Sequence, residues 1–127
     1  MATTVLVDAD IENGRKVVEA LDQEGVQVSS AFWLWDPEAE RFRLVLALPK
    51  TLTEGPKASY KHIREALERR NIVFPTGDIR VVTSTDETAT LLRQAVTTPP
   101  NAIGGIRFSS NVINNKLIED AYIYRST

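Results

Sequence analysis

Two neighbouring segments in the first half of the chain constrain its fold most strongly, because apolar and polar residues alternate along both of them. These segments are residues 26–35 and 41–48, and the polar linker between them contains Pro37. Alternation with a period of two is typical of a half-buried strand. We therefore predict a β-hairpin over about residues 26–48. A five-residue loop would place Trp35 opposite Arg41 and Trp33 opposite Arg43.

This predicted register gives the hairpin two different faces. The core face would carry the apolar residues Val28, Phe32, Leu34, Phe42, Leu44, Leu46 and Leu48. The other face would carry Trp33, Trp35, Arg41 and Arg43, with each tryptophan stacked on an arginine. Exposed tryptophan and arginine are typical of protein contact sites. The alternative is that a helix covers this face and makes both tryptophans core residues.

Apolar residues at helical spacing predict three helices, over about residues 9–24, 56–70 and 85–96. Gly25 suits the end of the first helix, and Pro56 suits the first turn of the second. Ser84 and Glu87 have the spacing of a capping box before the third. A short apolar run predicts a further strand at residues 79–83.

The last quarter of the sequence predicts a second hairpin, over about residues 103–124. Asn114 and Asn115 would form its turn, because asparagine tolerates the positive φ of a type I′ turn. In that register Arg107 lies opposite Tyr122. The whole pattern predicts a single α+β domain over residues 1–127, with a mainly antiparallel sheet and helices packed on one face.

The composition excludes several kinds of site. The chain has no cysteine and one histidine, so it forms no disulfide, no thiolate metal site and no two-histidine metal site of its own. We expect neither a metal nor a cofactor. The longest apolar runs are five residues, and the first thirty residues contain acids rather than a basic leader. We therefore expect a cytoplasmic protein without membrane association.

The net charge of −2 conceals an uneven distribution of charge along the chain. Residues 1–40 contain nine acidic and two basic residues, whereas residues 41–70 contain eight basic and three acidic ones. One interpretation is that the acidic first helix packs beside the basic second helix. The other is that the second helix, with Lys57, Lys61 and Arg64, binds an acidic or phosphate-bearing partner.

Acidic residues near both ends of the chain suggest a different chemistry. Residues 5–10, Val-Leu-Val-Asp-Ala-Asp, resemble the opening motif of haloacid-dehalogenase-type phosphatases. The resemblance implies Asp8 as nucleophile, Asp10 as general acid/base and magnesium as cofactor. It also implies a later acidic pair, which Glu119 and Asp120 supply. The alternative is that Asp8 and Asp10 stabilise the positive end of a helix dipole.

We expect a small non-enzymatic binding or regulatory protein that acts through protein contacts or self-association, including a homodimer. Its predicted contact residues are Trp33, Trp35, Arg41, Arg43, Lys57, Lys61 and Arg64. One alternative is a small metal-dependent phosphoryl-transfer or nuclease-like enzyme that uses Asp8 and Asp10 with Glu119 or Asp120. A second alternative is a nucleic-acid-binding module that uses the basic segment 41–70.

Overall fold

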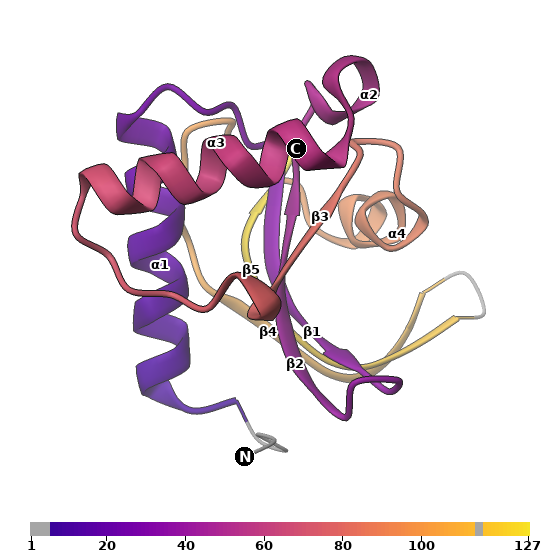
Figure 1. The fold of residues 1–127 in the computed structure, drawn as a ribbon. Coiled ribbons are helices and arrows are strands. Elements are labelled where there is room, and N and C mark those ends of the chain that lie inside the picture. The colour runs from indigo at the N-terminus through magenta and orange to yellow at the C-terminus, as the bar shows by residue number, and fades with distance from the viewer. Residues whose placement is uncertain (1–5, 114–115) are drawn as a thin grey trace.

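The computed structural model describes residues 6–113 and 116–127, without the side chains of residues 76 and 108–119. The predicted turn at residues 114–115 lies outside the described residues. Along the chain the elements are α1 (Asp8–Gln23), β1 (Ser30–Asp36), β2 (Arg41–Ala47), α2 (Thr51–Glu54), α3 (Pro56–Arg69), the 3₁₀ turn η1 (Thr76–Asp78), β3 (Ile79–Val82), α4 (Glu87–Ala95), β4 (Ile106–Ile113) and β5 (Lys116–Ser126) (Figure 1).

The five strands form one sheet in the order β3-β2-β1-β5-β4. Three of its neighbouring pairs are antiparallel, whereas β2 and β3 are parallel, so the sheet is mixed rather than built from antiparallel hairpins alone. The parallel pair needs a crossover, and α2 and α3 provide it. The predicted α+β composition is confirmed, and the three predicted helices end within two residues of their expected positions. The four-residue helix α2 was not predicted.

The register of the first hairpin differs by one residue from the prediction, which was therefore wrong. Asp36 pairs with Arg41, Trp35 with Phe42 and Trp33 with Leu44. The loop is one residue shorter than expected, because the Asp36 carboxylate accepts the N–H groups of the following turn and Glu40 closes that turn with φ 53°. A slip of one residue moves side chains to the opposite face. The tryptophans therefore share a face with Phe42 rather than with the arginines.

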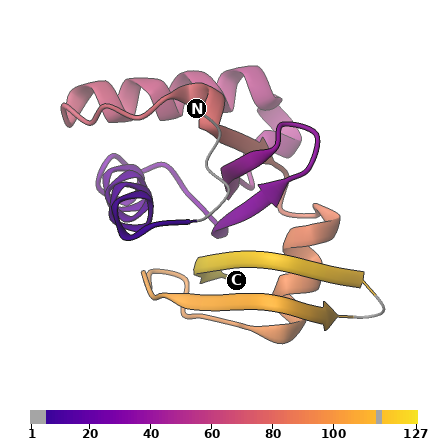
Figure 2. The ribbon, with the colours of Figure 1, turned by 90° about the horizontal axis from the view of Figure 1, so that it is seen from below.

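The register of the second hairpin is confirmed. Arg107 pairs with Tyr122, as the sequence predicted, and the neighbouring pairs join Ile106 to Ile123 and Phe108 to Ala121. Viewed from below, β4 and β5 lie on the far side of the first hairpin from α3 (Figure 2). The third helix begins differently from the prediction, because the side chain of Asp86, rather than Ser84, accepts the N–H of Ala89.

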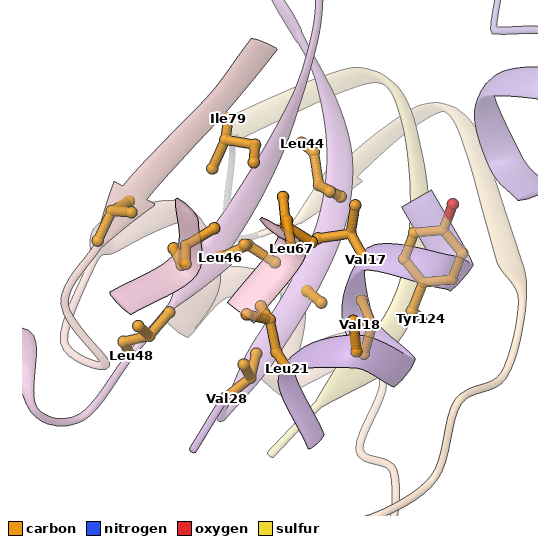
Figure 3. Close-up of a cluster of buried hydrophobic side chains, with 14 of the residues drawn as sticks. Val17, Val18, Leu21, Val28, Leu44, Leu46, Leu48, Leu67, Ile79 and Tyr124 are labelled. Atoms are coloured by element: carbon orange, nitrogen blue, oxygen red, sulfur yellow. The ribbon is translucent and has the colours of Figure 1, made fainter. Parts of the chain in front are cut away.

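Helices cover both faces of the sheet, whereas the sequence predicted helices on one face. The helices α1 and α3 pack on one face, and α4 packs on the other (Figure 1). Figure 3 shows the larger core, where α1 and α3 meet the sheet. The smaller core under α4 consists of Phe32, Val45, Ala47, Val82, Ala89, Leu92, Ala121 and Ile123.

Trp33 belongs to the larger core, where it and Tyr124 connect the sheet to α1. Trp33 is 4% exposed, and its indole N–H donates to the Tyr124 hydroxyl across 2.9 Å. That hydroxyl donates in turn to the carbonyl of Ile11 in α1. Burial raises the pKa of the Tyr124 phenol well above its usual range, so the hydroxyl stays protonated and can donate. Gly14 lies against both polar atoms, so a side chain there would displace them.

Among the described residues, no helix combines the length and hydrophobicity that crossing a membrane requires.

Candidate functional site

The outer face of α3 carries a row of cations. Spacing of i, i+4 and i+7 places Lys57, Lys61 and Arg64 on one face of the helix. The opposite face is buried against the sheet and α1 through Ser59, Ile63, Ala66 and Leu67. All three cationic side chains are exposed. The amphipathic pattern of α3 therefore turns this basic row toward solvent.

A groove of about 710 Å³ lies beside this row of cations. Its lining is mainly apolar and includes Pro56, Ala58 and Tyr60, while Glu54 of α2 also lines it. We call it the α3 groove. Its lining residues are Glu54, Pro56, Lys57, Ala58, Tyr60, Lys61 and Arg64. Its mixture of apolar and cationic lining residues suits a ligand that has both apolar and anionic groups.

Tyr60 lines the α3 groove, and two hydrogen bonds fix the position of its side chain. Its hydroxyl accepts the N–H of Val81 across 3.0 Å and donates to the carbonyl of Ile79 across 3.3 Å. Both partners are backbone groups of β3, an edge strand of the sheet. The tyrosine therefore gives the Val81 N–H of this edge strand a partner and shares the Ile79 carbonyl with Arg43. Its ring is held in place before any ligand arrives.

Most of the row is not neutralised within the protein. Lys57 and Arg64 have no ion-pair partner among the described residues, and Lys61 approaches Glu65 only at 4.0 Å. The other end of α3 behaves differently, because Arg69 and Arg70 pair with Glu24 of the α1 C-terminus at 3.4 and 3.0 Å. Packing of the acidic helix α1 on the basic helix α3 thus accounts for Arg69 and Arg70. Among the described residues, it gives the three cations of the row no acidic partner from α1.

Glu24 is the acid that joins the two helices. Hydrogen bonds from Arg70, and to a lesser degree Arg69, hold the pKa of its carboxyl below the usual value. A lowered folded-state pKa contributes stability above the unfolded pKa, and that contribution disappears as the pH falls through the folded pKa.

We predict that Glu24→Gln removes a pH-dependent part of the stability. Urea unfolding of the wild type and the variant should show the largest difference above about pH 5, because there the carboxylate is ionised in both states. The difference should shrink steadily toward pH 2. A difference that stays constant over this range would contradict the assignment of the ion pair.

The structure does not bring the four predicted contact residues of the first hairpin together. Trp33 is in the core, and Trp35 is half-buried with its ring edge-on to Phe42 at 5.3 Å. Arg41 and Arg43 extend from β2 to the adjoining η1–β3 segment. Arg41 donates to the carbonyl of Gly77 across 2.7 Å and lies 3.4 Å from Asp78, while Arg43 donates to the carbonyl of Ile79.

The Asp36 carboxylate accepts a second hydrogen bond from the Arg43 guanidinium, at 3.3 Å. Burial raises the pKa of the Asp36 carboxyl, but the N–H of Ala39, the guanidinium of Arg43 and the N–H of Glu38 together lower it below its usual value. These arginines therefore stabilise the protein's own hairpin and its edge strand.

The predicted acidic residues are dispersed. Asp8 and Asp10 lie in the first turn of α1, where the Asp10 carboxylate accepts the N–H of Val7 across 3.3 Å. Asp120 pairs with Arg107 at 3.1 Å, and the side chain of Glu119 lies outside the described part of the structure. No group of three or more histidine or acidic side chains that could hold a metal ion occurs among the residues described.

The cations of the α3 groove are among the contact residues predicted from the sequence, whereas its other lining residues are not. Tyr60 lies in the apolar stripe that predicted the helix, so it read as core only. Glu54 belongs to α2, which is too short to show a periodic pattern. Its carboxylate lies 3.3 Å from the imidazole of His62, the single histidine of the chain. The sequence marks this end of the groove only through Gly55 and Pro56, which predict where the helix begins.

Comparison with known proteins supplies no identification, since no family model, curated protein or solved structure matches the chain.

Proposed function

We propose that this protein is a non-enzymatic binding protein whose contact surface with other proteins is the α3 groove. The observation that carries this proposal is a row of three exposed cations, two of them without an ion-pair partner among the described residues, beside an apolar groove. An exposed cation without a partner gains little within the monomer, whereas three on one helix face attract a negatively charged surface. Complementary charge guides association and selects among partners.

The rest of the protein supports the choice of this surface. Four of the other five cations in the basic segment 41–70 have intramolecular partners, because Arg41 and Arg43 bind β3 and its approach while Arg69 and Arg70 bind Glu24. The fifth, Lys50, has no ion-pair partner among the described residues and lies outside the groove lining. The net charge of the chain is −2, so the basic row is a local feature. A local basic face on a slightly acidic protein favours contact in one orientation.

We predict that neutralising the row weakens binding to an acidic peptide by about 10- to 100-fold. The variant carries Lys57→Gln, Lys61→Gln and Arg64→Gln, and the probe is a fluorescein-labelled oligo-glutamate peptide followed by fluorescence anisotropy at low salt. Each exposed charge pair contributes about 0.5–1 kcal/mol, and three of them give this factor. Added salt should reduce the difference, because exposed charges are screened.

The matched control removes three other exposed cations, with Lys16→Gln, Lys50→Gln and Arg80→Gln. Their side chains have no ion-pair partner in the described part of the chain, and the change in net charge is the same. The control should bind the peptide within about twofold of the wild type. Equal losses in both variants would mean that net charge alone attracts the peptide, and the α3 groove would then not be the contact surface.

A further inference from the structure

We infer that the α3 groove receives an acidic amphipathic helix of a partner protein. This inference rests on the proposed function and adds the chemical class of the partner. Two properties of the groove carry it, namely the spacing of the cations and the apolar surface beside them. A helix lying in a groove is a common mode of protein recognition, and its apolar residues recur at helical spacing.

The intervals between the three cations match the intervals between residues on one face of a second helix. From Lys57 to Arg64 the row extends over seven residues, or about 10.5 Å at a rise of 1.5 Å per residue. A partner helix alongside α3 would present acids at i, i+4 and i+7 with the same two intervals. Each acid would then meet one cation without distortion of either helix. Lys61 would exchange its 4.0 Å approach to Glu65 for a closer pair.

The apolar part of the groove requires an apolar stripe on the partner. Pro56, Ala58 and the ring of Tyr60 line it, and the two bonds from the Tyr60 hydroxyl to β3 hold that ring in place. A leucine stripe next to the acids would cover this surface and remove it from water. An oligo-glutamate chain satisfies the cations but leaves the apolar surface bare.

A nucleic acid fits the same surface less well. Non-specific binding to nucleic acid draws its affinity from many phosphate contacts, and the row offers three cations. A single strand also binds by stacking its bases on several aromatic side chains, whereas the groove is lined by one, Tyr60. The observations therefore favour a protein helix.

Removing the charge of Glu54 should change the affinity for an acidic partner in the opposite direction from removing a cation. As an acid that lines the groove, Glu54 opposes an acidic partner. Glu54→Gln should therefore tighten binding by about two- to threefold, whereas loss of any one cation weakens it by a similar factor. Substitutions that acted only by disturbing the fold would all weaken binding.

The test uses the full chain and three synthetic peptides of about 14 residues. The first has glutamates at i, i+4 and i+7 with leucines on the adjoining stripe. The second has the same composition in scrambled order, and the third has glutamine in place of leucine. A single-stranded thymidine oligonucleotide of similar charge is the fourth probe. Affinity is measured by anisotropy, and peptide helicity is measured by circular dichroism.

We expect the ordered peptide to bind at least about tenfold more tightly than the other two peptides and to gain helicity on binding. Its binding should weaken in the variant with Lys57→Gln, Lys61→Gln and Arg64→Gln, and should strengthen with Glu54→Gln. Equal binding of ordered and scrambled peptides, lost in the triple variant, would overturn the helix inference and leave the proposed function intact. Tighter binding of the oligonucleotide, or binding of all probes that ignores the triple variant, would overturn both.

Discussion

Replacing Gly14 with alanine should lower the free energy of unfolding by about 2–4 kcal/mol, although alanine is the better helix former by about 1 kcal/mol. A Cβ at this position would lie 2.4 Å from the Tyr124 hydroxyl oxygen and 2.7 Å from the Trp33 indole nitrogen. Both atoms are buried and bonded to each other, so neither can move without breaking a buried hydrogen bond. Urea unfolding followed by tryptophan fluorescence measures the loss.

Two further variants separate the close contact from helix propensity. Asn13→Ala changes the neighbouring exposed residue of α1 and should leave stability unchanged or raise it slightly, since nothing is displaced. Tyr124→Phe removes the oxygen nearest to the new Cβ. This substitution should therefore lower the free energy of unfolding less in the Gly14→Ala variant than in the wild type. If Gly14→Ala were as stable as Asn13→Ala, the packing of α1 on Trp33 would be wrong.

The accuracy of the sequence-based prediction depended on whether local residues determine each feature. The register of β4 and β5 follows from a short connection flanked by alternating strands, and it was confirmed at Arg107 and Tyr122. The register of β1 and β2 was missed because Asp36 serves both as the last strand residue and as the acceptor of the turn. The parallel pairing of β3 with β2 depends on contacts across the crossover, which no local pattern records.

The candidate site shows the same division. Helical spacing alone places Lys57, Lys61 and Arg64 on one face of α3, so the row could be predicted. That none of the three pairs with an acid of α1 in the described part of the chain could not be predicted, because it depends on which end of α3 meets Glu24. The burial of Trp33 depends on Tyr124, which lies 91 residues further along the chain. Neither relation has a signature in the spacing of residues.

Asp22→Ala is expected to lower the free energy of unfolding by about 3 kcal/mol, the other large effect that the structure predicts. Arg125 is 1% exposed, and its guanidinium makes two bonds to the Asp22 carboxylate, at 2.9 and 2.6 Å. It also donates to the carbonyls of Ala102 and Val28. Without the aspartate, a buried cation keeps only neutral acceptors. The side chain of Asp22 is one-third exposed, so water reaches the site and limits the loss.

The control for this charge pair is Glu19→Ala. Glu19 is an exposed acid of the same helix, and it has no ion-pair partner in the described part of the chain. Its effect should stay within about 0.5 kcal/mol. Combining Asp22→Ala with Arg125→Met removes both charges, and the double variant should be more stable than the sum of the single effects predicts, because a buried methionine needs no counter-ion. Additive effects would mean that the two residues do not act as a pair, and that the end of β5 is held to α1 by packing alone.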